Sequence, residues 1–275
     1  MKKLPASRPS PLKVYVSASS RGLAFEIARM FALDGADIAL SSRNASHLET
    51  ARQMILAARP GAQVITIQGD IASEGDQGKI LATLDSVNFL PDVFVCSAGH
   101  PKEGRLSSLS RADWSHELEM ILGHAVFASQ KFALGMAERG FGRLIFLSSL
   151  YAKAPNHDFF ISSLARSALF ALSKMVAGEY ADRGVAAFVV CLGFIDTPLL
   201  RNRALGRPHD EPDPEESLLE TWSARYDEWA AEIPAKRIAT PAELARFISF
   251  LTLPEAEYLN GNVFSFSGGM DKEII

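Results

Sequence analysis

The sequence predicts an α/β fold: a doubly wound, seven-stranded and mostly parallel sheet with helices on both faces. Seven apolar, β-branched runs of strand length recur along the 275 residues, and helical patterns separate them. These runs are apolar on both faces, as are the strands of a parallel sheet that helices cover on each side. With 48% hydrophobic residues, a chain of this length can bury one sizeable core, so we expect a single domain.

The order of the elements follows from the same patterns. The expected strands are 12–18, 36–42, 63–69, 91–98, 142–149, 186–193 and 262–268, and helical periodicity marks 22–33, 44–58, 111–138, 163–182 and 241–252, among others. We expect a mobile tail over 1–11 and one domain over 12–275. The stretch 199–234 departs from the alternation, since it joins an acidic, Pro-rich turn to a Trp-bearing helical pattern. Ligands bind beyond the carboxyl ends of parallel strands, so this stretch is expected to form a lid on the substrate side, with 210–216 as a solvated loop.

Composition excludes several classes of function. The net charge is −4 and the isoelectric point is about 5.9, which predicts no nucleic-acid partner. Cys96 and Cys191 lie in apolar runs and are expected to be reduced core thiols. No apolar stretch is expected to reach the roughly 18 residues of a membrane span, and the first residues contain no apolar region of a secretory signal. We therefore expect a cytoplasmic protein with no membrane contact, and the sequence predicts no metal site.

The first predicted strand runs directly into a turn and a helix that suit a dinucleotide. A tight turn before a helix directs backbone amides toward a pyrophosphate. Gly22 is the one glycine of this turn, and the methyl group of Ala18 is expected to crowd a cofactor or to forbid a positive φ. The second strand ends without an acid to accept from a ribose 2′-hydroxyl. Arg21 and Arg43 are instead placed to hold a 2′-phosphate, which favours NADP(H) over NAD(H).

Several stretches resemble the short-chain dehydrogenase/reductase family, and in particular its 3-oxoacyl-reductase-like members. SASSRGLA at 17–24 is similar to the family's T-G-x-x-x-G-x-G turn, and GRLIFLSS at 142–149 to its fifth strand. The runs 168–198 and 241–269 resemble its interface helix with the sixth strand and its closing helix with the last strand. The resemblance spans about 12–270 and implies a Rossmann-type fold and an oxidoreductase activity.

The resemblance also assigns residues to the NADP(H) cofactor. Asp70 and Ile71 match the pair that contacts adenine, and the segment 193–197 matches the nicotinamide end. The full set comprises Ser17, Ala18, Ser20, Arg21, Gly22, Leu23, Ser42, Arg43, Asn44, Asp70, Ile71, Ser97, Ala98, Gly99, Gly193, Ile195 and Thr197.

The same alignment reveals departures at the catalytic positions. Ser149 matches the serine that orients the substrate oxygen. Thirteen residues on, Ser162 falls where the family has its tyrosine, and Arg166 falls where it has its lysine. Seven residues after Trp114, Ile121 takes the place of the structural asparagine. Three of the four members of the catalytic tetrad are therefore expected to be absent.

These replacements change the available chemistry. Carbonyl reduction needs an acid, and a phenol whose pKa is near 10 serves once an adjacent ammonium lowers it. A serine hydroxyl is a far weaker acid, and an arginine holds its proton but can grip an anion with two hydrogen bonds. Tyr151, two residues after Ser149, is the best replacement acid by position. His157 beside Asp158, on the same loop, and His100 are further candidates.

Arg166 also invites comparison with the halohydrin dehalogenases, which use a Ser-Tyr-Arg set without a nucleotide. Ser149 and Arg166 fit that set, but Ser162 breaks it. Those relatives also fill the nucleotide site, whereas this chain keeps Arg21 and Arg43. The match is poor.

Three functional hypotheses remain open at this point. The first is an NADP(H)-linked oxidoreductase that acts on a small carbonyl, hydroxy or 3-oxoacyl substrate with rearranged acid chemistry. The second is a catalytically silent subunit that stabilises an active homologue. The third is a non-redox lyase, isomerase or dehydratase in which Ser149, Ser162 and Arg166 form an oxyanion or carboxylate pocket. Because the family's tetramers pack helices and the last strand, we expect a homo-oligomer (dimer or tetramer) or a hetero-oligomer with a homologue.

Overall fold

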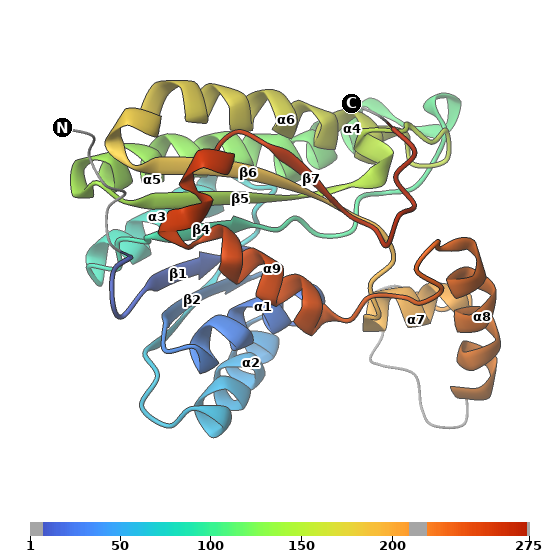
Figure 1. The fold of residues 1–275 in the computed structure, drawn as a ribbon, viewed down its shortest axis with the longest axis horizontal. Coiled ribbons are helices and arrows are strands. Elements are labelled where there is room, and N and C mark those ends of the chain that lie inside the picture. Colours follow the sequence, from blue (N-terminus) through green and yellow to red (C-terminus); the bar gives the residue numbers. More distant parts are fainter. Residues whose placement is uncertain (1–7, 209–218, 274–275) are drawn as a thin grey trace.

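A computed structural model describes residues 8–208 and 219–273, and within them seven strands form one sheet (Figure 1). The strand order is β3-β2-β1-β4-β5-β6-β7, and every neighbouring pair is parallel. The strands are β1 (Lys13–Val16), β2 (Asp37–Ser42), β3 (Val64–Gln68), β4 (Val93–Cys96), β5 (Gly142–Ser149), β6 (Val185–Leu192) and β7 (Val263–Phe266). The predicted fold class and all seven predicted strands are confirmed.

The helices are α1 (Gly22–Leu33), α2 (Ala45–Ala58), α3 (Glu74–Ser86), α4 (Arg111–Leu118), α5 (His124–Arg139), α6 (Phe160–Tyr180), α7 (Pro198–Ala204), α8 (Leu219–Glu232) and α9 (Pro241–Leu251). The single helix expected over 111–138 was wrong in one respect. A π-helical turn, Glu119–Gly123, separates α4 from α5. The helix α3 had not been singled out, because its apolar positions form only a short stripe on a polar helix.

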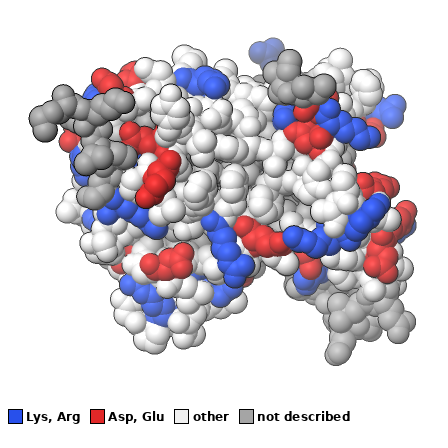
Figure 2. All heavy atoms as spheres, viewed as in Figure 1, with Lys and Arg blue, Asp and Glu red and all other residues white. Residues whose placement is uncertain are grey.

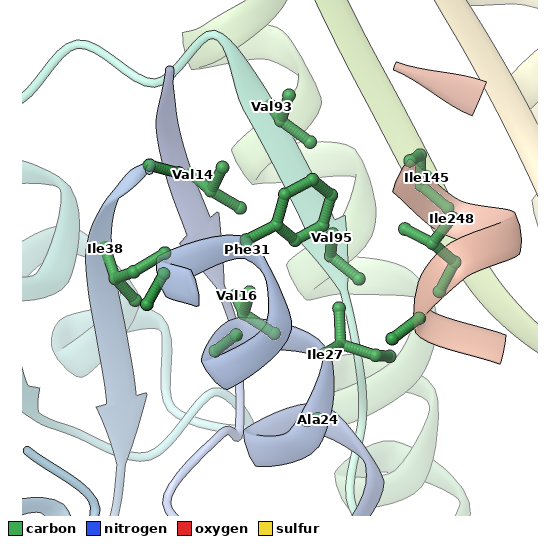
Figure 3. Packing of buried hydrophobic residues seen from close by; sticks show 14 of the residues in the cluster. Val14, Val16, Ala24, Ile27, Phe31, Ile38, Val93, Val95, Ile145 and Ile248 are labelled. Carbon is green, nitrogen blue, oxygen red and sulfur yellow. The ribbon is translucent and has the colours of Figure 1, made fainter. Parts of the chain in front are cut away.

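Two hydrophobic cores lie on opposite faces of the sheet. Helices α1, α2 and α9 cover one face, and α3, α4, α5 and α6 cover the other (Figure 1). Figure 3 shows the first core, where Ile27 and Phe31 of α1 lie over Val14, Val16 and Val95 of the central strands. These side chains are almost fully buried. Apolar strands covered on both faces therefore account for the fold, as expected.

One expectation about membranes needs correction. Within the described residues, the helix Phe160–Arg183 is long and apolar enough to cross a membrane by length and composition. The prediction that no stretch reaches this length was wrong by that criterion. The helix packs against β5, β6 and α5, so we interpret it as a core helix.

The thiols and the surface charges agree with the composition. Cys96 and Cys191 are free and buried, which confirms the prediction of reduced core thiols. On the face drawn in Figure 2, cationic and anionic side chains are interspersed. The expected tail lies mostly outside the described residues, as does the acidic run 210–216.

Candidate functional site

The order in which successive strands are added to the sheet changes side between β1 and β4. From β1 it proceeds to β2 and β3 on one side, whereas β4 leads to β5, β6 and β7 on the other. The turns after β1 and β4 therefore lead to opposite halves of the sheet, at the kind of switch point where doubly wound folds have their ligand-binding crevice. Ser17 joins the two turns, because its hydroxyl donates to the Ser97 carbonyl at 2.7 Å and accepts from the Ser97 amide at 3.0 Å.

The turn after β1 adopts left-handed backbone at two positions. Gly22 has φ +61°, and a Cβ added there would meet no atom within 4 Å. Ala18 has φ +50°, so the expectation that its methyl group would forbid a positive φ was wrong. An L-residue other than glycine adopts this conformation at a cost of about 1–2 kcal/mol. The turn thus keeps a glycine-type shape without the glycine.

Helix α1 begins at Gly22 with no acidic residue in its first turn, so nothing there opposes an anion. Arg21 is the N-cap residue of this helix and is exposed, as is Arg43 after β2. Leu23, in the first turn, packs against the core beneath. The Ser20 and Ser42 hydroxyls are 2.8 Å apart, which ties the first turn to the end of β2. The structure thus brings this part of the predicted cofactor set to one edge.

Other members of that set have visible structural roles. Asn44 caps α2, since its Oδ1 accepts from the His47 amide at 3.0 Å. The Asp70 Oδ1 accepts from the Ala72 amide at 2.9 Å, and Ile71 is a core residue. These contacts fix the loops after β2 and β3.

The segment predicted to meet the nicotinamide end links β6 to α7. The Gly193 amide donates to the Phe266 carbonyl at 2.9 Å, and a Cβ at Gly193 would lie 3.0 Å from the Ser267 Cα. Ile195 is buried, and Thr197 caps α7 by accepting from the Leu200 amide at 3.3 Å. Across the crevice, after β4, Ala98 packs against the second core, and the Gly99 Cβ position lies 3.4 Å from the Met120 sulfur.

The predicted catalytic residues meet where β5 and α6 adjoin. Ser149 ends β5, and its hydroxyl accepts from the Tyr151 amide at 3.2 Å. Ser162 is 6% exposed near the start of α6. One turn further, a guanidinium nitrogen of Arg166 donates to the Leu147 carbonyl on β5 at 2.9 Å. Burial lowers the pKa of Arg166, although a guanidinium stays charged near neutral pH.

The candidate replacement acids lie on the neighbouring loops. The Tyr151 ring stacks on Phe159 with 4.6 Å between ring centroids. The Asp158 carboxylate accepts a hydrogen bond from Arg105 Nε at 2.8 Å, so it pairs with Arg105 and not with the imidazole of His157. His100 lies 3.0 Å from a Glu103 carboxylate oxygen. Arg105 and His157 help to line an open hollow of about 620 Å³ together with Leu106, Ser107 and Phe160.

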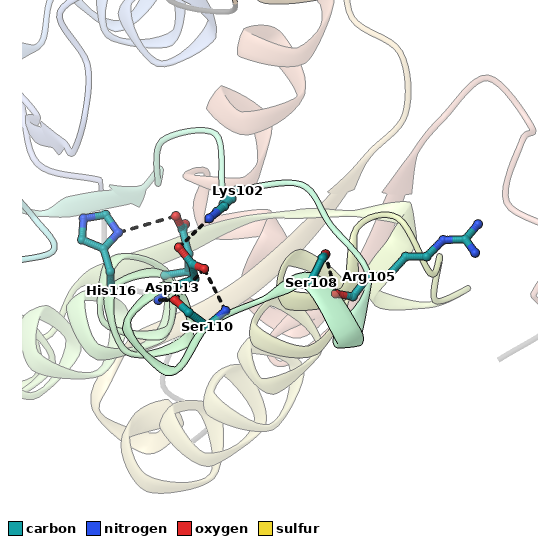
Figure 4. A network of polar contacts seen from close by, with 7 residues as sticks. Lys102, Arg105, Ser108, Ser110, Asp113 and His116 are labelled. Carbon is teal, nitrogen blue, oxygen red and sulfur yellow. Dashed lines mark hydrogen bonds and ion pairs between the residues drawn. The ribbon is translucent and has the colours of Figure 1, made fainter.

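A polar network fixes the start of α4 (Figure 4). Asp113 accepts from Lys102 Nζ at 2.8 Å and forms a reciprocal capping box with Ser110. The hydrogen bond from Lys102 is the first cause that lowers the pKa of Asp113, to about 2. The Trp114 ring meets Phe160 of α6 edge-on at 5.5 Å between centroids. The face that α4 presents to α6 is therefore well defined.

One residue of this face was missed by the sequence analysis. Glu117 is 7% exposed, and its Oε2 has no hydrogen-bond partner. Its Oε1 lies 3.5 Å from His116 Nδ1. The signal in the sequence is an acidic residue at helical spacing between Trp114 and Ile121, and Ile121 is itself buried in the π turn.

The two helices after β6 lie beyond the carboxyl ends of the strands (Figure 1). They share a small hydrophobic cluster with the segment before α9, formed by Leu200, Trp222, Ile233 and Ile238. The Phe194 and Trp229 rings stack beside it at 5.2 Å. The predicted substrate-side segment therefore contains α7 and α8, and its role as a lid stays a prediction. In the part of the chain that the structure describes, no group of three or more His, Cys, Asp or Glu residues is placed to hold a metal ion.

Comparison with known proteins gives full-length matches. The family model described as enoyl-(acyl carrier protein) reductase matches residues 17–271. Human dehydrogenase/reductase SDR family member 4 is 26% identical over 263 residues, which are 94% of this chain and 87% of that protein. The 3-oxoacyl-[acyl-carrier-protein] reductase FabG of Chlamydia trachomatis is 26% identical over 260 residues, or 93% and 95%. The crystal structure of L-sorbose reductase from Gluconobacter frateurii, complexed with NADPH and L-sorbose, matches with a TM-score of 0.86 and 27% identity over 98% and 99% of the two chains.

Proposed function

The chain belongs to the short-chain dehydrogenase/reductase family, and from this premise we propose that it is an NADP(H)-dependent oxidoreductase of a small carbonyl, hydroxy or 3-oxoacyl compound. One observation carries the proposal. The turn at the β1–β4 crevice keeps positive φ at Ala18 and Gly22, with open space beside Gly22. A dinucleotide pyrophosphate needs this combination of turn, space and helix N-terminus.

The residues around the crevice fit NADP(H) by charge. Arg21 and Arg43 are exposed at the edge that would receive the 2′-phosphate, and neither the end of β2 nor the first turn of α1 carries an acid. When bound, the nicotinamide cofactor would supply or accept the hydride. The α1 N-terminus would hold the pyrophosphate, and Gly193 and Thr197 would meet the nicotinamide end. The NADPH in the L-sorbose reductase structure supports this choice of cofactor.

At the catalytic end we propose that Ser162 and Arg166 stand in place of the family's tyrosine and lysine. Ser149 would orient the substrate oxygen, and the charged Arg166 would stabilise negative charge that develops there. The serine hydroxyl at position 162 is too weak an acid to replace a phenol. The usual proton donor is therefore missing from its usual place.

Titration of the purified protein with NADPH and NADH tests the cofactor assignment. We expect saturable NADPH binding, seen by fluorescence or calorimetry, at least tenfold tighter than NADH binding. Arg43→Ala should remove most of that preference, because the 2′-phosphate loses a charged hydrogen-bond donor. Arg52→Ala, which alters a half-buried arginine of α2 that pairs with Glu49, is the matched control. Failure to bind either nucleotide would overturn the proposed function.

A second proposal concerns assembly. Phe127 and Leu134 on α5, and Leu164 and Met175 on α6, are large apolar residues that are exposed in the single chain. They support a homo-oligomer, or a hetero-oligomer with a homologue. We further propose a cytoplasmic location, which the two free buried thiols support.

A further inference from the structure

Glu117 is a buried carboxylate that the proposed function has not used. Its side chain is 7% exposed, and Oε2 has no partner among the described residues. A buried oxygen without a hydrogen bond destabilises a fold, so such a group in a native protein calls for an explanation. A catalytic role is one of the explanations that such a group admits.

Glu117 occupies the face of α4 that turns toward the catalytic helix. It lies three residues after Trp114 and four before Ile121, and residues at this spacing share one helix face. Trp114 contacts Phe160 in the first turn of α6, and Ile121 is buried. Ser162 lies two residues after Phe160 on the same helix. Glu117 therefore lies on the face of α4 that meets α6, the helix that carries Ser162 and Arg166.

Glu117 has ionisable neighbours. Burial is the main influence on the pKa of Arg166 and lowers it, and the Glu117 carboxylate opposes this effect after the two cysteines. From its own helix, His116 approaches Oε1 at 3.5 Å. From the sheet, the thiols of Cys96 and Cys191 also act on Arg166. Carboxyl groups rank after histidine among the proton-transfer groups that enzymes use.

We propose that Glu117 is the catalytic proton-transfer residue of this site, in place of the missing phenol. The proposal rests on the proposed NADP(H)-linked function. In carbonyl reduction the nicotinamide would supply the hydride that forms the C–H bond at the carbonyl carbon, and the C=O π electrons would move to oxygen. The Glu117 carboxyl O–H bond would break, and its proton would join that oxygen to give the alcohol. The positive charge of Arg166 would favour the carboxylate that remains. In alcohol oxidation the same carboxylate would take the hydroxyl proton while the oxidised nicotinamide would accept the hydride from carbon.

Turnover measurements separate Glu117 from its neighbour Glu119. The assay follows NADPH oxidation with a panel of L-sorbose and an acetoacetyl thioester, and NADP⁺ reduction with the corresponding alcohols. Glu117→Gln should lower kcat by about 100-fold or more, the usual size of a general acid–base contribution, with unchanged NADPH binding. Glu119→Gln is the matched control, since Glu119 accepts from Gln77 and helps to line an open hollow on another side of the helix. It should leave turnover within about twofold of the wild type.

Rescue and stability provide readouts that a structural role would not reproduce. Added formate should restore part of the turnover of Glu117→Ala, because a free carboxylate can enter the vacated space. Glu117→Leu should raise the melting temperature by about 2 °C or more while it abolishes turnover, since it removes an unpaired buried oxygen.

The outcomes distinguish the two proposals. A wild-type protein that binds no nicotinamide nucleotide overturns the proposed function. If Glu117→Gln binds NADPH and turns over the panel as fast as the wild type does, the role of Glu117 is overturned and the proposed function stands. A wild type that binds NADPH but turns over no member of the panel also counts against that role, as does a Glu117→Leu variant that loses stability.

Discussion

Ala18, in the turn after β1, adopts a left-handed backbone conformation that strains an L-residue. Ala18 holds φ +50° at a place where its neighbouring contacts, from Ser17 to Ser97, fix the loop. The surrounding hydrogen bonds over-determine the turn, so the alanine follows it despite its Cβ. The strain lies at the position where a cofactor would approach.

We expect Ala18→Gly to stabilise the folded protein by about 1 kcal/mol, because glycine adopts this φ without a steric cost. Urea unfolding measures the change. Ala24→Gly, which places glycine in the regular helix α1, should instead destabilise by about 1 kcal/mol and serves as the control. Equal effects of the two variants would contradict the assignment of strain to Ala18.

A second residue-scale effect concerns His124. Burial lowers the pKa of its imidazole from 6.5 to about 4, and its Nε2 has no partner among the described residues. In the unfolded chain the imidazole binds a proton near pH 6.5, whereas the folded protein does so only near pH 4. Stability is therefore lost as the pH falls from about 6.5 to about 4.

From this shift, His124 should account for a loss of about 2 kcal/mol in unfolding free energy between pH 7.5 and pH 5. His124→Leu should remove that part of the pH dependence in urea unfolding measured at both pH values. The exposed His47, changed to Gln, is the comparison and should leave the pH dependence as it is. A His124→Leu protein with the wild-type pH dependence would show that His124 titrates normally.

The residues of the candidate site were predictable to different degrees. Ser149, Ser162 and Arg166 were located by counting along a gapless resemblance, and the structure brings them to one strand–helix junction. Glu117 was not found, because a sequence does not show which face of a polar helix is buried. The positive φ of Ala18 was also missed, since the loop contacts that enforce it come from residues about 80 positions away.

At the scale of elements, helix starts are the clearest local signals. Thr240 caps α9, and its hydroxyl accepts from the Glu243 amide while Glu243 accepts from the Thr240 amide. Arg237 binds the same carboxylate with two hydrogen bonds, at 2.9 and 2.6 Å, and these are the first cause that lowers the pKa of Glu243 to about 2. The helix that this cap begins covers the first core.

Thr240→Ala should destabilise the protein by about 1 kcal/mol through loss of the cap. The measurement is the unfolding midpoint in urea at constant slope. Thr50→Ala, on the exposed side of α2 and away from a helix start, should change stability by less than about 0.5 kcal/mol. A similar effect at both sites would argue against a specific capping contribution.

Strands and most helices were predictable because their apolar patterns depend on burial on both faces of one sheet. The break between α4 and α5 was not, since the helical period of 111–138 continues across the π turn. A single extra residue in a turn shifts the hydrogen bonds but leaves the apolar spacing almost unchanged. The π turn contains the buried Ile121, the position that the sequence analysis aligned with the family's asparagine.

At the scale of the whole molecule, the exposed apolar residues of α5 and α6 make assembly testable. Met175 is 71% exposed and Leu164 is 52% exposed, both on the outer side of the core helix. Leu164→Glu with Met175→Glu should convert the oligomer to a monomer in light scattering coupled to size-exclusion chromatography, because charge is depleted in the centre of interfaces.

Met54→Glu is the control for that experiment. Met54 is 49% exposed on α2, on the opposite face of the sheet. This change should leave the oligomer intact. A wild-type chain that is monomeric at micromolar concentration would contradict the proposed assembly.

The hydrophobic cluster of α7 and α8 is separate from the two cores of the sheet. Among the described residues, its buried members are Leu200, Trp222, Ile233 and Ile238, so this part can open as a cooperative unit of its own while the sheet stays folded. Native-state hydrogen exchange should therefore find α8 amides exchanging through a lower free-energy barrier than α1 amides. If the segment acts as the predicted lid, the stability of this cluster would set how often the site opens, so a substitution within the cluster would change the rate of product release.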